Sequence, residues 1–320
     1  MQTIADVASR FGALREQLDR VIIGQERVKG LAITSLVAGG HMLLEGAPGT
    51  GKTLLALALS RLVGCRFRRI QFTPDLMPAD LLGANIFSQK TQEFALRPGP
   101  VFTDVLLADE INRTPPRTQA ALLESMQENA VTIDGVRYKV SPVFTVFATQ
   151  NPVEFEGTYP LPEAQRDRFL FKINIEFPEA ADESRMLEAY AQGKRLHDET
   201  VASLQPVMNG DDLFAARRTV ASGVRVEPQI IKYIQALVAR TRTDESVQIG
   251  AGPRASLALL EGSRAAAAIS GRDFITPDDV KSLVAPVLAH RVTLSPEAEM
   301  EGMALEDLLS RIFDQVEVPR

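Results

Sequence analysis

A glycine-rich run of eight residues, Gly46–Thr53, carries the clearest chemistry in this 320-residue sequence. It reads GAPGTGKT and fits the spacing G-x-x-x-x-G-K-[ST] of a phosphate-binding loop. Its glycines let backbone N–H groups converge on phosphate oxygens, and a helix that begins here adds its dipole. In this pattern Lys52 reaches the β- and γ-phosphates and the Thr53 hydroxyl binds Mg²⁺. The residues expected to hold the nucleotide are Gly46, Ala47, Pro48, Gly49, Thr50, Gly51, Lys52, Thr53 and Leu54.

The segments on both sides of this loop support the interpretation. His41–Glu45 is a short apolar run that predicts a strand. Leu54–Val63 is rich in Leu and Ala and predicts a helix that ends at Gly64. A strand, a glycine-rich turn and a helix are what a phosphate-binding loop requires, whereas an ordinary glycine-rich turn, the alternative, needs no such succession.

Two adjacent carboxylates, Asp109 and Glu110, stand at the end of a second apolar run, Val105–Asp109. Ligands of open α/β sheets bind at the carboxyl ends of strands, so this position favours a functional pair over solvated surface charges. We expect Asp109 to hold Mg²⁺, directly or through water, and Glu110 to be the base that polarises the attacking water. The pair therefore predicts hydrolysis as well as binding.

An amide follows a third apolar run. Val143–Thr149 predicts a strand, and Asn151 lies in the polar segment that follows it, before a proline. An amide at this place can orient water against the γ-phosphate. The alternative is an Asn-Pro turn initiator, and Thr149 and Gln150 are further candidates for the same role.

Arginines supply the last set of candidates. Arg168, with Arg166 as the alternative, precedes the last predicted strand, and phosphoryl transfer is accelerated by a cation that arrives from another subunit. Arg254 lies in the first turn of a helix predicted to begin at Pro253, where a cation opposes the helix dipole. Because this placement is unfavourable, we expect Arg254 to reach the nucleotide from a second domain. An exposed arginine tolerated at small cost is the alternative.

The order of segments predicts an α/β domain followed by a helical one. An amphipathic helix at the N-terminus precedes strand-like and helix-like segments that alternate as far as Phe177, which is typical of a layered α/β fold. A segment punctuated by Pro and Gly interrupts the alternation between Thr73 and Phe102. The five strand candidates are apolar almost throughout, as in a buried parallel sheet. They are His41–Glu45, Arg68–Phe72, Val105–Asp109, Val143–Thr149 and Phe169–Ile175.

After Pro178 strand signals fade and helical ones dominate. Four of the predicted helices open with proline in the first turn, where its missing N–H is not needed. We therefore expect a nucleotide-binding core at residues 1–180 and a helical domain at residues 181–320. The predicted helices are Asp182–Leu196, Asp211–Ala221, Pro228–Arg242, Pro253–Ser270, Pro277–His290 and Pro296–Phe313.

Charge, cysteine content and hydrophobicity limit the partners and the compartment that we expect for this protein. The net charge of −6 provides no general attraction for nucleic acid. The dense basic cluster Arg66–Arg69 is interpreted as a solvated or intersubunit face. A single cysteine, Cys65, excludes a disulfide within the chain and is interpreted as a packing residue. The sequence shows no cationic leader and no long apolar run, so we expect a soluble, cytoplasmic protein without membrane insertion.

These elements, in this order, resemble an AAA+ ATPase, and the longer motifs are similar to the MoxR family. The resemblance covers about residues 3 to 315. One small departure is visible in Gly-Ala-Gly-Pro-Arg at Gly250–Arg254, where the family commonly has Ser in place of Gly252. The motifs that carry it are VIIGQE at Val21–Glu26, EGAPGTGKT, FTPDLMPADLLG at Phe72–Gly83, RPGPVFTDVLLADEINRTPPRTQAALLESMQE at Arg97–Glu128, ATQNPVEFEGTYPLPEAQRDRF at Ala148–Phe169 and ITPDDVKSLVAPVLAHR at Ile275–Arg291.

The resemblance implies a five-stranded parallel sheet with strand order 5-1-4-3-2 and a C-terminal all-α lid. It implies that about residues 73–100 form an insertion in helix 2 that faces the pore of related rings. It implies ATP and Mg²⁺ as cofactors, Ile23, Gly24 and Gln25 near the adenine, and a hexameric ring in which the arginine near Phe169 completes the site of the neighbour. The family resembles chaperones that use ATP to mature or activate partner proteins, often ones with a von Willebrand factor A domain and its metal site.

Two other functions fit parts of the pattern. One is a nucleotide-gated binding module with very slow turnover, and the other is a nucleic-acid motor. The acidic balance and the lack of interleaved aromatic and basic residues make nucleic acid an unlikely partner.

Overall fold

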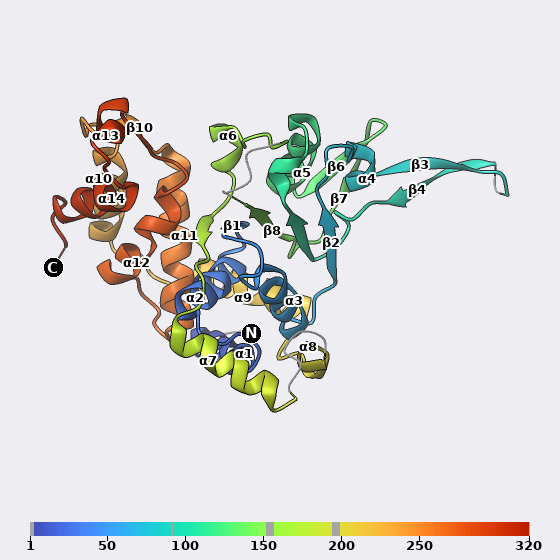
Figure 1. Ribbon diagram of the computed structural model, residues 1–320, viewed down its shortest axis with the longest axis horizontal. Coiled ribbons are helices and arrows are strands. Elements are labelled where there is room, and N and C mark those ends of the chain that lie inside the picture. Colours follow the sequence, from blue (N-terminus) through green and yellow to red (C-terminus); the bar gives the residue numbers. More distant parts are fainter. Residues whose placement is uncertain (1–2, 91, 152–156, 194–198, 320) are drawn as a thin grey trace.

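A parallel five-stranded sheet forms the centre of the computed structural model, which describes residues 3–90, 92–151, 157–193 and 199–319 (Figure 1). The strand order is β2-β5-β8-β1-β9, which is the predicted 5-1-4-3-2. Each strand begins and ends within two residues of its predicted limits. The strands are β1 (Met42–Glu45), β2 (Phe67–Gln71), β5 (Val105–Asp109), β8 (Thr145–Gln150) and β9 (Phe171–Asn174).

Alternation along the strands divides the core into two layers. Leu106 and Ala108 of β5 belong to one apolar cluster, with side chains of the helix α5 (Pro116–Glu128). Leu107, between them, belongs to the other cluster, on the opposite face of the sheet. The helices α1 (Ile4–Asp19), α2 (Glu26–Ala38), α3 (Lys52–Leu62) and α9 (Gly210–Gly223) contribute to this second cluster. Because β5 is covered on both faces, all of its residues can be apolar except the carboxylate at its end.

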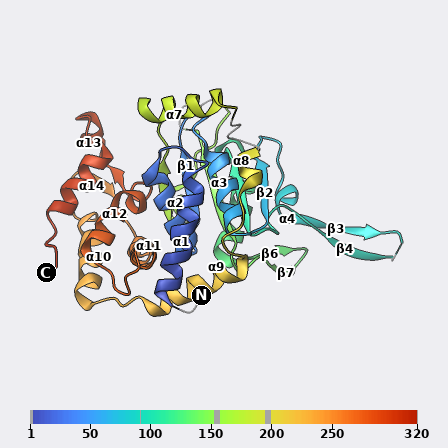
Figure 2. The same ribbon diagram turned by 90° about the horizontal axis from the view of Figure 1, so that it is seen from below.

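The interrupted segment before β5 forms a short helix and a projecting hairpin. The helix is α4 (Pro78–Leu82), and the antiparallel strands β3 (Gly83–Ser88) and β4 (Glu93–Pro98) extend away from the sheet (Figures 1 and 2). A second antiparallel pair, β6 (Ala130–Ile133) and β7 (Val136–Lys139), follows α5. Asn85 Nδ2 of the first hairpin donates to Asp134 Oδ2 of the second at 2.9 Å. Neither hairpin was predicted, although Asp134-Gly135, with φ +49° and +79°, is a typical two-residue hairpin turn between β6 and β7.

The second half of the chain is mostly helical, as predicted. The helices that the sequence expected to begin at Pro228, Pro253, Pro277 and Pro296 all begin there. The elements are α6 (Glu163–Arg166), α7 (Ala180–Ala191), α8 (Glu199–Ser203), α10 (Pro228–Arg240), β10 (Val247–Ile249), α11 (Pro253–Ile269), α12 (Pro277–Leu288), β11 (Thr293–Leu294), α13 (Pro296–Met300) and α14 (Leu305–Asp314), with a 3-10 turn at Ile111–Arg113.

Two predicted helix lengths were wrong. The single helix expected at Pro296–Phe313 is two, because Gly302 adopts φ +75° between α13 and α14. The helix expected at Asp182–Leu196 ends at Ala191, since Gly193 adopts φ +82°. The remainder of that prediction, residues 194–196, lies outside the described residues. Among the described residues, the helices are all too short or too polar to cross a membrane.

Candidate functional site

The glycine-rich loop lies between β1 and α3, and its glycines have conformations that other residues rarely adopt. Gly49 and Gly51 have φ values of +83° and +86°. A Cβ atom on Gly46 would overlap the carbonyl oxygen of Ile175. Helix α3 begins at Lys52, directly after Gly51, so its free N–H groups open into the loop. The backbone therefore has the form that anion binding requires.

Lys52 stands at the start of α3 and turns back onto the loop. Its Nζ donates to Gly46 O at 2.8 Å and to Ala47 O at 2.7 Å. Burial lowers the pKa of Lys52, and the charges of Asp109 and Glu110 oppose that shift. The ammonium thus lies between the phosphate-binding backbone and the two carboxylates.

The two carboxylates are oriented by one hydroxyl. Thr149 Oγ1 donates to Asp109 Oδ1 at 2.6 Å and accepts from the Glu110 N–H at 2.8 Å. Glu110 has φ +56°, an uncommon value for a residue with a side chain, which costs on the order of 1–3 kcal/mol. The hydrogen bond from its N–H to Thr149 helps to hold that conformation. Thr149, which the sequence offered only as a substitute for Asn151, therefore has a positioning contact with both carboxylates.

Strand β2 provides partners that the sequence reasoning missed. Arg69 donates to Asp109 Oδ2 through Nε at 3.0 Å and through Nη2 at 2.6 Å. Gln71 Nε2 donates to Glu110 Oε2 at 2.5 Å, and Arg113 forms an ion pair with the same oxygen at 3.1 Å. The sequence places residues 69 and 71 on one face of a strand, but their partners depend on the pairing of that strand with β5. The interpretation of Arg66–Arg69 as a solvated or intersubunit face missed this contact of Arg69, whose side chain is still 51% exposed.

A pocket of about 410 Å³ collects most of the predicted residues. Asn151 lines it together with the loop and both carboxylates, and only 8% of this residue is exposed. Gln25 contacts the loop, because its Nε2 donates to Thr50 O at 3.2 Å. The preceding Gly24 has φ +68° and lies against the Asp182 carboxylate, where a Cβ would overlap it. The described lining residues are Gly46, Pro48, Gly49, Thr50, Gly51, Lys52, Thr53, Leu54, Leu57, Arg69, Asp109, Glu110, Thr149, Gln150 and Asn151.

The donor set of this pocket fits Mg²⁺ bound with a nucleotide. Thr53 and Asp109 are the oxygen donors beside the loop. Among the described residues there is no group of three or more His, Cys, Asp or Glu side chains that could hold a metal ion alone. Mg²⁺ usually takes one or two protein oxygens, with substrate phosphates and water as its other ligands.

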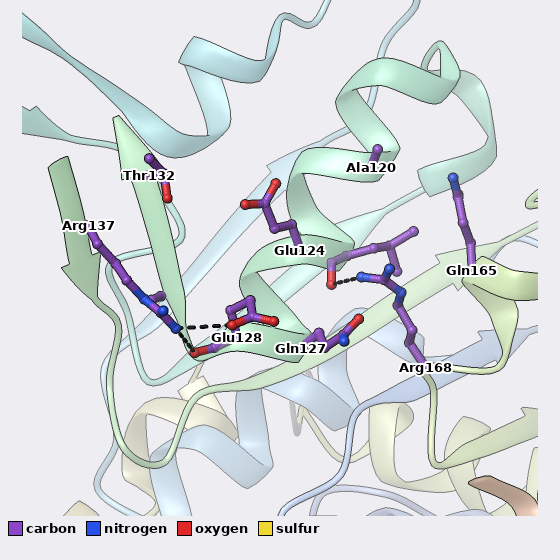
Figure 3. A pocket seen from close by; sticks show the side chains of 10 residues that line it. Ala120, Glu124, Gln127, Glu128, Thr132, Arg137, Gln165 and Arg168 are labelled. Atoms are coloured by element: carbon purple, nitrogen blue, oxygen red, sulfur yellow. Dashed lines mark hydrogen bonds and ion pairs between the residues drawn. The ribbon is translucent and has the colours of Figure 1, made fainter. Parts of the chain in front are cut away.

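The candidate arginines lie outside this pocket. Arg168 Nη1 donates to Leu123 O of α5 at 2.6 Å, in a separate cavity of about 470 Å³. Figure 3 shows Arg168 and Gln165 in this cavity, with Glu124 and Gln127 of α5 facing it. Two buried polar atoms there, Arg168 Nε and Gln165 Oε1, have no hydrogen-bond partner among the described residues.

Arg254 and Arg166 also lie apart from the phosphate loop of their own chain. Arg254 Nη1 is 3.6 Å from Asp167 Oδ2, and its side chain is 48% exposed. Arg166 lies near Glu163, at 4.0 Å. As predicted, Arg254 is in the first turn of α11, with Gly252 at the cap position. The structure therefore brings the arginines together around Asp167 and leaves the nucleotide pocket without them.

Known proteins resemble this chain along nearly its whole length. The family described as "ATPase family associated with various cellular activities (AAA)" matches residues 41–171, and the AAA lid domain matches residues 239–312. The chain is 44% identical to the uncharacterised protein YeaC of Bacillus subtilis, with 98% of this chain and 96% of that protein covered. It is 40% identical to Chaperone MoxR1 of Mycobacterium tuberculosis, with 95% and 81% covered. Protein MoxR of Paracoccus denitrificans is 33% identical, with 99% and 98% covered. A crystal structure of a Cytophaga hutchinsonii protein superposes with a TM-score of 0.90 at 34% identity, covering 99% and 97%.

Proposed function

This chain belongs to the MoxR family of AAA+ ATPases, and on that premise we propose that it hydrolyses ATP in an oligomeric ring to remodel or activate partner proteins. The single observation that carries the ring is the separation of the arginines from the nucleotide pocket. One region of each chain carries the glycine-rich loop and the two carboxylates. Another region carries the arginines around Asp167, which lie away from the loop of their own chain. A second copy that presents its arginines to this pocket would supply the pocket with cations and would give the arginines a phosphate to bind.

The pocket supports a direct hydrolysis mechanism. Lys52 and the loop N–H groups would hold the β- and γ-phosphates. Thr53 and Asp109 would hold Mg²⁺, which would neutralise charge on those phosphates. Glu110 accepts a proton from water as that water attacks the γ-phosphorus, and ADP leaves on the opposite side. Asn151 orients the water or the γ-phosphate from the end of β8. Gln25, with Ile23 beside it, would contact the adenine.

The cavity around Arg168 supports a contact with a neighbouring subunit. Arg168 Nε and Gln165 Oε1 are buried polar atoms without a hydrogen-bond partner in the described part of the chain, and such atoms in native structures usually have one. In the ring, Arg168 would leave Leu123 O and reach the γ-phosphate of the neighbour, with Arg166 as the alternative. Arg254 would act beside it. We infer a hexamer, in line with the family resemblance.

The projecting hairpin is the proposed contact for the client. It exposes Ile86, Phe87 and Phe94, whose side chains are 47%, 49% and 73% exposed. The two phenylalanine rings stack edge to face with centroids 5.3 Å apart. Exposed aromatic pairs on a polar hairpin mark an interaction surface. We propose that the client is a protein, with a von Willebrand factor A domain as the first one to test.

The test is ATP turnover over a series of protein concentrations for the wild type, Arg168→Ala and Arg137→Ala. Arg137 lies in the same cavity but pairs with Glu128 and is 62% exposed, so its loss is the matched control. We expect specific activity to rise with concentration in the wild type and in Arg137→Ala. Arg168→Ala should lose about 10³- to 10⁵-fold in turnover while it still binds ATP, the range measured for arginines supplied by another subunit. Turnover independent of both concentration and Arg168 would contradict a shared site, and Arg166 would then be tested.

A further inference from the structure

A residue of the lid binds the backbone on both sides of Arg168. Arg291 follows the C-terminal end of α12, and its Nη2 donates to Asp167 O at 3.0 Å and to Phe169 O at 2.6 Å. Its Nη1 donates to Leu170 O at 3.2 Å. The segment that carries Arg168 is therefore attached to the lid through main-chain atoms, whatever side chains it bears.

The guanidinium of Arg291 is buried and uses its full set of donors. Its side chain is 3% exposed, Nε donates to Asp167 Oδ1 at 2.7 Å, and Nη1 donates also to Val287 O at 2.6 Å. With the three bonds to the Arg168 segment, these contacts match the five N–H groups of the planar fork. The neighbouring His290 is also buried, with Nε2 3.0 Å from Phe169 O. A buried cation that lost these partners would be strongly destabilised, so this docking geometry is tightly specified.

Asp167 extends the link to the second candidate arginine. Its Oδ1 accepts from Arg291, and its Oδ2 lies 3.6 Å from Arg254 Nη1. Arg254 comes from α11, Arg291 from the end of α12, and Asp167 directly precedes Arg168 in sequence. One carboxylate and one buried guanidinium thus join the two arginines that are proposed to act on the neighbour.

We propose that Arg291 is the positioning residue that holds Arg168 and Arg254 as one rigid unit, presented to the ATP of the neighbouring subunit. This inference rests on the proposed ring mechanism. Arg291 touches neither nucleotide nor reacting atoms, and it acts only through the segment 167–170. A lid movement would therefore move both arginines together, which couples lid position in one subunit to hydrolysis in the next.

The experiment is complementation between subunits in mixed rings. Arg291→Ala keeps its own nucleotide pocket and loses an ordered arginine face, whereas Glu110→Gln loses its pocket and keeps that face. We expect Arg291→Ala alone to lose about 100-fold in turnover, the loss that a displacement of about 1 Å can cause. ATP affinity should be unchanged. Mixing with excess Glu110→Gln should raise turnover per Arg291→Ala subunit at least tenfold. In such mixed rings, the intact arginine face of a Glu110→Gln subunit meets the intact pocket of an Arg291→Ala subunit.

Two comparisons separate this inference from simple lid stabilisation. Arg272 lies at the opposite end of α12 from Arg291 and makes two hydrogen bonds to Asp279, at 2.7 and 2.6 Å. Arg272→Ala should lower the melting temperature, because it removes the cation that pairs with the buried Asp279 carboxylate. Turnover per folded ring should stay within about twofold of the wild type, because the pair lies apart from the nucleotide pocket and from the segment 167–170. Arg291→Lys keeps the positive charge but lacks the planar guanidinium with its five N–H donors. It should therefore remain folded, and its turnover should be restored by Glu110→Gln as for Arg291→Ala.

The outcomes are distinct for the two proposals. If Arg168→Ala is rescued by Glu110→Gln but Arg291→Ala and Arg291→Lys are fully active, or are inactive without rescue, the positioning role is overturned and the ring remains. If Arg168→Ala itself is fully active, the proposed ring mechanism fails first. Should Arg291→Ala not fold, Arg291→Lys decides the same question.

Discussion

The nucleotide pocket and the arginine face of this chain are built in different ways. The pocket is a backbone structure, a glycine-rich loop whose N–H groups point to one place, supported by carboxylates at the ends of neighbouring strands. The arginine face is a side-chain structure, in which Asp167 and main-chain carbonyl oxygens hold Arg168, Arg254 and Arg291, from the core and the lid. Arg166 lies beside them, near Glu163. The difference teaches that one chain places the loop with its carboxylates apart from these arginines. Under the proposed mechanism, the two regions would meet between chains.

Loss of Glu110 should have the largest effect on the pocket half. Glu110→Gln removes the proposed base while Lys52, Thr53 and Asp109 remain, so turnover should fall by about 10²- to 10⁴-fold, the usual range for general base catalysis. ATP affinity should stay within about twofold of the wild type. Single-turnover hydrolysis and equilibrium binding of a fluorescent ATP analogue measure the two effects.

The matched control for Glu110 is Glu124→Gln, which changes a carboxylate of the cavity at Arg168 instead. We expect this control to keep normal single-turnover rates. Normal hydrolysis by Glu110→Gln would remove the base from the pocket half, and the two regions would then no longer divide the chemistry as described.

Arg254→Ala tests whether the division between the regions holds for the lid. Because Arg254 lies at Asp167 and not at the loop of its own chain, its loss should lower turnover of the assembled ring by about 10- to 100-fold, equivalent to one hydrogen bond to a charged group. ATP binding by dilute, unassembled protein should not change. A weaker ATP affinity in the dilute protein would show that Arg254 acts in its own pocket, and the comparison would be wrong for this residue.

The fold could be predicted well wherever one physical signal dominated. The central strands β1, β5 and β8 are mostly apolar because both faces of the sheet are covered there. Proline in the first turn correctly predicted where four helices begin. The hairpin β3–β4 could not be predicted in the same way, since its strands are largely exposed. The hairpin β6–β7 was missed although β6 is mostly buried and Asp134-Gly135 is a typical hairpin turn. Gly302 ended a helix for a reason visible only in its backbone angle.

The site residues also divide into those that the sequence could predict and those that depend on the fold. The loop residues and the two carboxylates could be placed from spacing, because their chemistry requires contiguous sequence. Arg69 and Gln71 could not, since their roles depend on the pairing of β2 with β5, 40 and 39 residues away in sequence from their partners. Arg254 was identified as unusual from its helix position, but only the packing of the lid determines which pocket it can reach.

Mild acid should weaken the arginine face through His290. Burial, and the nearby charge of Arg291, hold the pKa of His290 well below its usual 6.5. Above pH 6.5 the residue is neutral in both folded and unfolded chains, so its contribution to stability is fully present. As pH falls below 6.5, the unfolded chain binds a proton that the folded chain does not, and stability falls by up to about 1.4 kcal/mol per pH unit.

Urea denaturation at pH 7, 6 and 5 measures this effect in the wild type and in His290→Gln. The variant should be less stable at pH 7 but should lose less stability than the wild type on acidification. Part of the slope should remain, because burial also lowers the pKa of His41, the residue before β1, to about 4. An identical slope in His290→Gln and the wild type would show that the face is open to water at His290.

Arg69 offers the smallest effect and the sharpest test of the comparison, because it is a cation inside the pocket half. It donates twice to Asp109 Oδ2, the carboxylate that is proposed to hold Mg²⁺, and its side chain is 51% exposed. An exposed ion pair contributes about 0.2–1 kcal/mol. Arg69→Ala should therefore raise the apparent Mg²⁺ affinity by at most about fivefold, as measured by Mg²⁺ titration of bound fluorescent ATP analogue.

Arg68→Ala is the matched control, since Arg68 donates to Gly99 O and does not line the pocket. If Arg69→Ala instead weakened nucleotide binding without Mg²⁺, Arg69 would be a phosphate ligand. The pocket would then contain a catalytic arginine of its own beside Lys52, and the arginine face would not be the sole source of arginines for the reaction.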